Sequence, residues 1–155
     1  MQHHPAMPPV RSIVDKVSNI RKWITKLSIS QEQLGNHSIC PFAATANVHI
    51  QEVEVGDIAP VPGVDVAIFI VSDTLTLHDL EDLCERLNSI WVDYVFLDDH
   101  KDDPSYINGI QSNYGESNLI LVQRKDKLMW AREQLKKSDY YHYWSKEMYN
   151  KIVKG

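Results

Sequence analysis

Residues 64–71 read VDVAIFIV, and every residue of this stretch except Asp65 is apolar. A strand with one face in water alternates apolar and polar residues, whereas a strand buried on both faces is apolar almost throughout. Pro60, Pro62 and Gly63 lie just before the stretch and are typical of a turn. We therefore predict a central strand at residues 64–71, and the other elements are placed around it.

Apolar residues spaced three and four positions apart predict helices on both sides of this strand. One stripe runs over residues 13–27, and we expect its helix to end near Gly35. A second stripe runs over residues 77–87. The C-terminal part carries two shorter stripes, at residues 128–135 and 141–152.

Three further strands are expected, at residues 48–55 with a bulge near its middle, at 92–97 and at 119–123. The order is then α-β-β-α-β-β-α-α. The strand that follows the helix at 77–87 should run parallel to the central strand, with a right-handed crossover. The sequence therefore predicts an α/β (α+β) fold with one four-stranded mixed sheet and helices packed on it.

Length and composition favour one domain. A chain of 155 residues, 43% hydrophobic and 24% charged, suits a single hydrophobic core. Prolines disfavour a helix over residues 1–10, which we expect to be a mobile arm, and residues 11–155 form the domain.

The sequence also indicates where in the cell the protein is located. The longest apolar run, Val66–Val71, is far shorter than the roughly 18 residues that a membrane helix needs. We see no secretory signal, and two cysteines are too few for a disulfide framework. We therefore expect no membrane partner and a cytoplasmic protein.

Charge is unevenly distributed along the chain. Residues 47–103 contain fourteen acidic and two basic residues, while residues 122–155 contain nine basic and four acidic ones. Basic residues interleaved with aromatic ones, as in this second stretch, can bind single-stranded nucleic acid. The net charge of −5 and the helical spacing of the aromatic residues argue against nucleic acid as a partner.

The densest polar segment, LDDHKDDPSY at residues 97–106, begins where a strand is expected to end. Asp99, His100, Asp102 and Asp103 could bind Mg²⁺ or Mn²⁺, which prefer oxygen ligands and tolerate one nitrogen. The alternative is a surface loop in which aspartates cap turns. No fixed metal-ligand motif decides between the two.

The loop that contains this segment, Asp98–Ser117, is long for a compact domain, and long loops are often functional. Within it Tyr106, Asn108 and Asn113 offer hydrogen-bonding groups for a small polar ligand. We therefore take these three residues as candidate ligand contacts.

A second candidate segment is NHSICPFA, Asn36–Ala43. A cysteine becomes a nucleophile when a base or a positive charge stabilises its thiolate, and His37 lies three residues from Cys40. We therefore name Cys40 and His37 as candidate catalytic residues. The alternative is that Cys40 is a small, buried apolar residue.

Three motifs occur in an order that resembles an uncharacterised bacterial family. They are Trp23 in the first helix, ICPFA at residues 39–43 and DDPSYIN at residues 102–108. The family carries LCPFA after a tryptophan-bearing helix and DDPxxYTNRSPYP before its last strand. Gly109 stands where that pattern has arginine, and the letters SNYG replace SPYP. The resemblance implies a shared fold and a common site near Cys40 and Asp102, and no reaction.

Two functions follow from these observations. The first is a small enzyme or ligand-binding protein whose polar site joins Asn36–Ala43 to Asp98–Ser117. The alternative is a non-catalytic interaction protein that docks through aromatic C-terminal helices, with a homodimer as one such arrangement. A pocket between the two loops would favour the first, and an exposed apolar patch around Tyr141, Trp144 and Met148 would favour the second.

Overall fold

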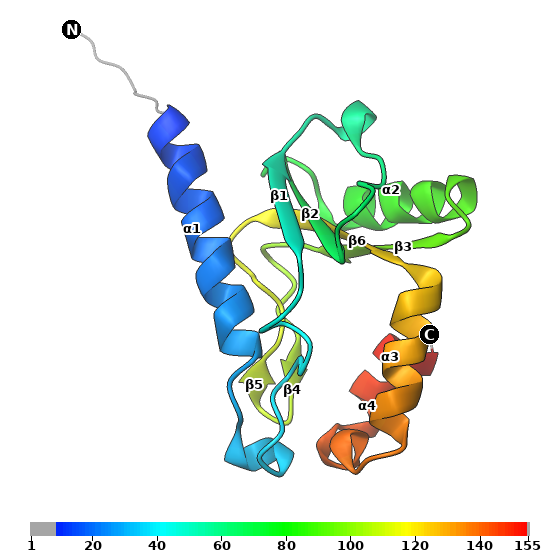
Figure 1. Cartoon of the computed structure of the whole chain (residues 1–155). Helices are drawn as coiled ribbons and strands as arrows, with labels where there is room; N and C mark the ends of the chain where they lie inside the picture. Colours follow the sequence, from blue (N-terminus) through cyan, green and yellow to red (C-terminus); the bar gives the residue numbers. More distant parts are fainter. Residues whose placement is uncertain (1–8, 155) are drawn as a thin grey trace, which may run out of the picture.

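A four-stranded mixed sheet lies in the middle of the chain (Figure 1). The computed structural model describes residues 9–154. The strands are β1 (Val48–Glu52), β2 (Val66–Val71), β3 (Tyr94–Asp99) and β6 (Asn118–Arg124), in the order β1-β2-β6-β3. β1 is parallel to β2, and β6 is antiparallel to both of its neighbours. The predicted α+β class and four-stranded mixed sheet are confirmed.

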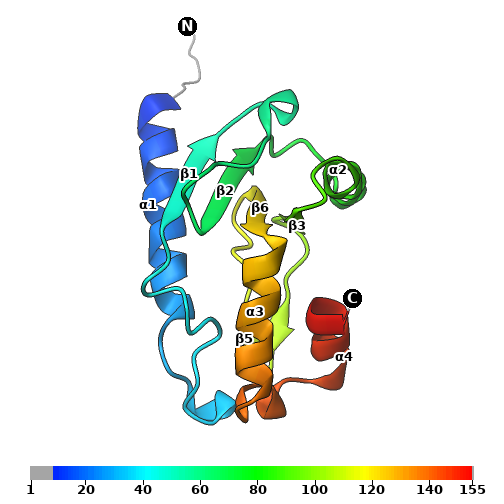
Figure 2. The ribbon, with the colours of Figure 1, turned by 45° about the vertical axis from the view of Figure 1, so that its right-hand side comes forward.

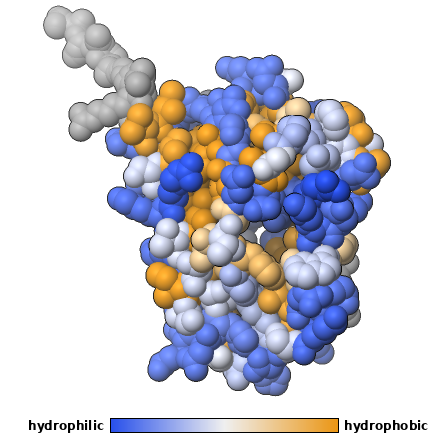
Figure 3. All heavy atoms as spheres, in the orientation of Figure 1, coloured by the Kyte–Doolittle hydropathy of each residue, from blue (hydrophilic) through white to orange (hydrophobic). Residues whose placement is uncertain are grey.

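β2 is an interior strand, and both of its faces are buried. Ala67, Phe69 and Val71 face the apolar core under helix α2 (Leu77–Ile90). Ile68 and Ile70 face the opposite core, which α1 (Pro9–Leu27) covers. The sheet therefore lies between two helical layers, and apolar side chains remain visible beside α1 in the upper left of Figure 3.

The first helix differs from the prediction at its end. It stops at Leu27, well before Gly35, because the amide of Cys40 returns along the chain and donates to the Leu27 carbonyl at 2.8 Å. A short 3₁₀ turn, η1 (Glu32–Leu34), follows. At the other end α1 begins at Pro9, and the rest of the expected arm lies outside the described residues.

One prediction about the strands was wrong in detail. β1 ends at Glu52 and pairs with β2 in regular register, without a bulge, before the 3₁₀ turn η2 (Val55–Asp57). β3 runs in the same direction as β2, as expected, but β6 lies between them. The order of strands along the chain did not reveal this insertion, because pairing is a long-range property.

The expected long loop contains a small hairpin of β4 (Tyr106–Ile107) and β5 (Ile110–Gln111). Its turn residues, Asn108 and Gly109, have φ values of 48° and 85°. Asparagine followed by glycine is the strongest short signal for a two-residue turn with positive φ at both positions. The sequence therefore contained a signal for this hairpin, and the prediction of an irregular loop over residues 98–117 overlooked it.

The C-terminal part is divided more finely than expected. α3 (Lys125–Lys136) is followed by the 3₁₀ turn η3 (Tyr140–Tyr143), the short α4 (Lys146–Tyr149) and the π turn η4 (Asn150–Lys154). The predicted continuous helix over 141–152 was wrong, because the Ser145 hydroxyl caps a new helix by accepting from the Met148 amide. Among residues 9–154, no helix is both long and apolar enough to cross a membrane.

β3 is an edge strand, and a side chain from α2 covers part of its free edge. The Asn88 carboxamide donates to the Phe96 carbonyl at 3.1 Å and accepts from the Phe96 amide at 2.7 Å. The Asn88 carboxamide thus takes the place of the peptide group that a neighbouring strand would supply. Unpaired edges invite association with other chains, so Asn88 protects this edge.

We predict that Asn88→Ala lowers the free energy of unfolding by about 1.5 kcal/mol. Two hydrogen bonds of about 1 kcal/mol each are lost, and the better helix propensity of alanine offsets about half a kcal/mol. Urea denaturation measures the change. Ser89→Ala on the same helix is the matched control and should stay within about 0.5 kcal/mol of the wild type. An Asn88→Ala variant as stable as the control would contradict this role.

Candidate functional site

Asp99 ends β3 and is buried at the carboxyl edge of the sheet. Its carboxylate accepts from the Asn113 side chain at 3.0 Å and from the Tyr114 amide at 2.9 Å. Burial raises the pKa of Asp99, although both hydrogen bonds oppose this shift. These contacts fasten the loop that precedes β6 to the end of β3.

His100 and Asn118 form a second buried polar cluster beside Asp99. The Leu75 carbonyl accepts from His100 Nε2 at 2.7 Å and from Asn118 Nδ2 at 3.1 Å. His100 Nδ1 accepts from the Asp102 amide at 3.1 Å. Both ring nitrogens of His100 are therefore used within the protein, and neither is left for a metal ion.

The expected Mg²⁺ or Mn²⁺ site is not assembled by its four candidate ligands. Asp99 and His100 are buried and bonded internally, whereas Asp102 is exposed and its carboxylate contacts the Lys101 ammonium at 3.2 Å. The amide of Asp103 donates to the His100 carbonyl in a turn. No group of three or more His, Cys, Asp and Glu residues in the part of the chain that the structure describes could hold a metal ion.

The candidate ligand contacts have mixed positions. The Asn108 amide donates to the Gln33 carbonyl at 2.6 Å and thereby joins the hairpin to η1. Asn113 accepts from the Ser105 amide at 2.8 Å, in addition to its bond with Asp99. Tyr106 is exposed. The side chains of Asn108 and Asn113 therefore make hydrogen bonds within the protein that hold the loop in place.

The candidate nucleophile and base are not paired with each other. His37 Nε2 lies 2.7 Å from Asp139 Oδ1, at the start of the aromatic C-terminal segment. Burial raises the pKa of the Cys40 thiol, against the effect of the Phe42 and Ala43 amides. A raised pKa leaves less thiolate at neutral pH, so this environment does not activate Cys40.

The other cysteine, Cys84, is a packing residue of the core. Cys84 is buried on the sheet-facing side of α2, and burial raises its pKa to about 12. Neither cysteine thus has the environment of a reactive thiol.

The two loops do meet, but through apolar contacts. Ile39 from Asn36–Ala43 packs with Ile107 and Ile110 of the hairpin in a cluster centred on Leu34. Trp23 reaches the same loop, because its indole donates to the Ser112 carbonyl at 3.3 Å. The motifs that carried the family resemblance therefore converge in space as packing residues.

A cavity of about 720 Å³ lies in the C-terminal segment, and sequence reasoning identified only part of it. Its lining combines cations with aromatic rings: Lys136, Ser138, Asp139, Tyr141, His142, Trp144, Lys146 and Tyr149. The rings of Tyr141 and Trp144 meet edge to face at 5.0 Å. The signal was present in the interleaved basic and aromatic residues of this stretch.

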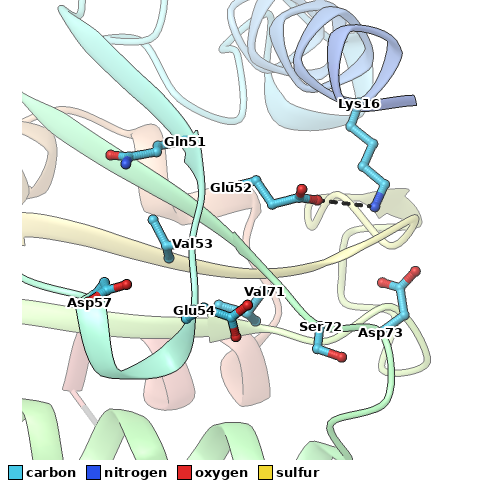
Figure 4. A pocket seen from close by; sticks show the side chains of 9 residues that line it. All are labelled: Lys16, Gln51, Glu52, Val53, Glu54, Asp57, Val71, Ser72 and Asp73. Atoms are coloured by element: carbon cyan, nitrogen blue, oxygen red, sulfur yellow. Dashed lines mark ion pairs between the residues drawn. The ribbon is translucent and has the colours of Figure 1, made fainter. Parts of the chain in front are cut away.

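A second cavity, of about 520 Å³, lies at the carboxyl ends of the parallel strands β1 and β2. Figure 4 shows Lys16 of α1 reaching Glu52 at the end of β1, at 3.5 Å, with Glu54, Asp57 and Asp73 around the same space. Ligands of α/β proteins usually bind at such strand ends. The sequence did not reveal this site, because the prediction placed the parallel pair elsewhere.

We predict that the stabilising effect of Asp99 weakens as the pH rises. A carboxyl group whose pKa is raised by burial binds its proton more tightly in the folded state, so ionisation costs stability. The difference in unfolding free energy between wild type and Asp99→Asn should therefore fall as the pH increases above about 4. Urea denaturation across this range measures it. A difference that grows with pH would mean that the two hydrogen bonds outweigh burial.

Comparison of the chain with protein-family models, curated proteins and solved structures finds no match in any of the three. The resemblance to the bacterial family with the LCPFA motif therefore stays a prediction.

Proposed function

We propose that this protein is a non-catalytic binding module whose C-terminal cavity takes an acidic segment of a partner protein. The observation that carries the proposal is the lining of this cavity, where Lys136 and Lys146 lie among aromatic side chains. Lysines attract carboxylates, and aromatic rings supply large contact area at little entropic cost. A surface of this kind suits a peptide with both acidic and apolar residues.

The charges around the cavity favour an anionic occupant. Lys146 has no ion pair within residues 9–154, while Lys136 contacts Glu133 at 3.3 Å. Asp139 is the acidic residue of the lining, and it is already bonded to His37. Asp139 is therefore already bonded within the chain, and the charge of Lys146 is left to act on a partner.

The anchoring of this segment also supports a binding role. The Tyr140 hydroxyl donates to the Ile39 carbonyl, and Tyr140 is buried between the segment and the rest of the chain. Gly35, with φ of 64°, lies so close to the Tyr143 ring that a Cβ there would clash with it. These contacts position the aromatic residues before a partner arrives, which lowers the entropic cost of binding.

We predict that an acidic peptide binds and that Lys146→Glu weakens it about tenfold, since an attraction becomes a repulsion. The probe is a fluorescein-labelled peptide of glutamates with one central phenylalanine, followed by fluorescence anisotropy. Binding should weaken as salt rises from about 50 to about 300 mM, because exposed charges are screened.

Lys151→Glu is the matched control, because Lys151 is exposed in the same segment and does not line the cavity. It should bind almost as the wild type does. Equal weakening by both substitutions would indicate attraction by overall charge alone. That result, or no binding at all, would remove the proposal.

A small polar ligand with positive charge is the second candidate, in line with the ligand-binding function expected from the sequence. The cavity at the ends of β1 and β2 favours it. Glu54, Asp57 and Asp73 have no ion pair in the described residues, and Lys16 is the one cation in the lining. The excess of carboxylates selects for a cation.

For this candidate we predict that spermidine binds in isothermal titration calorimetry and that Glu54→Gln weakens binding, because it removes one carboxylate from the lining. The matched control is Glu116→Gln, an exposed glutamate outside the lining. Heat that is absent, or that both variants reduce equally, would exclude a specific site there.

A further inference from the structure

Large apolar side chains are exposed at the end of the sheet opposite the β1 and β2 cavity. Ile90 at the end of α2 and Trp91 and Val92 in the turn that follows are exposed, Val92 to 64%. On the first turns of α3, Met129 and Trp130 are exposed, Trp130 to 61%. Five such residues in two short segments are more than scattered surface residues would explain.

These two segments are neighbours in space. The amide of Lys125, the first residue of α3, donates to the carbonyl of Asp93, the residue after Val92, at 2.9 Å. Met129 lies one helical turn beyond Lys125 and therefore on the same side of α3. Figures 1 and 2 both show α3 starting beside the turn that enters β3. We call the five exposed residues the turn and helix patch.

The helices on either side of this patch carry opposite charge. α2 contains four acidic residues and one basic residue, and all four acidic ones are exposed, among them Glu81 and Glu85. α3 contains four basic residues and two acidic ones. Lys125 is exposed and has no ion pair in the range that the structure covers. The patch thus separates an acidic helix from a basic one.

We propose that a second copy of this chain covers the turn and helix patch in a two-fold symmetric dimer. A two-fold axis through the patch places the acidic α2 of one copy against the basic α3 of the other, and each contact occurs twice. The apolar residues then lie in the middle of the interface, and the charges lie at its rim. Such an arrangement is complementary to itself without any other partner.

The way β3 is protected restricts how the two copies meet. Asn88 occupies the outward amide and carbonyl of Phe96, so addition of a strand to this edge is blocked at that residue. The contact is therefore made by side chains of the patch. This inference goes beyond the proposed peptide binding and does not depend on it, because the C-terminal cavity is not part of the patch.

Sedimentation equilibrium of the full chain over a range of concentrations tests the dimer. We expect the mass of two chains at low salt and weaker association at high salt. Trp130→Ser should raise the dissociation constant at least tenfold while leaving the far-UV circular-dichroism spectrum, which reports the fold, unchanged. Ile29→Ser removes another exposed apolar side chain, outside the patch, and should not alter association.

A charge exchange tests the symmetry. Glu81→Lys with Glu85→Lys should weaken the dimer, and adding Lys125→Glu with Lys127→Glu should restore it. A monomer at every concentration would overturn the proposal. A dimer insensitive to Trp130→Ser, or one not restored by the charge exchange, would overturn it as well. None of these outcomes bears on peptide binding, which is measured separately with the labelled peptide.

Discussion

The burial of β2 on both faces is the constraint on which the rest of the structure depends. Its residues 66–71 are among the most apolar of the chain, and five of the six are buried. Water must be excluded from both sides, so the sheet needs one helix above and one below. α1 and α2 supply these layers. Three strand ends, those of β1, β2 and β3, then point to the same edge of the sheet, and β6 begins there.

That edge also explains why the most polar residues are not free for chemistry. Buried polar groups cost free energy unless each is hydrogen-bonded. Asp99, His100 and Asn118 are all buried and all bonded within the chain. Together they hold the end of β3 and the start of β6 to the loop between β2 and α2 and to the loop before β6. A cluster of aspartates and a histidine that binds an ion has the same sequence pattern as one that only stabilises a loop. The deciding property is whether its lone pairs remain available, and only coordinates reveal this.

Elements that depend on neighbouring residues could be predicted from the sequence, and elements that depend on contacts between distant residues could not. The central strand and the α2 stripe were predictable, because burial imposes a local pattern on neighbouring residues. The hairpin at Asn108 and Gly109 was also readable from the sequence. The end of α1 was not, because it depends on an amide from Cys40, thirteen residues further along the chain. The place of β6 between β2 and β3 depends on contacts that are still more distant. Only the aromatic part of the C-terminal cavity was predictable, because the spacing of the aromatic residues indicated Tyr141 and Trp144. The turns that bring Lys136 and Lys146 beside them were not predicted.

The central claim is that the polar loop residues maintain the fold and that partners bind at the C-terminal segment. Chemical-shift mapping tests this most directly, by titrating the acidic peptide into ¹⁵N-labelled protein and following every backbone amide. The account predicts shifts that are concentrated in residues 136–149, with little change in residues 36–43 apart from those touching His37, and none in residues 98–118. Shifts concentrated in residues 98–118 would contradict it, because they would mean that the loop around Asp99 binds ligand.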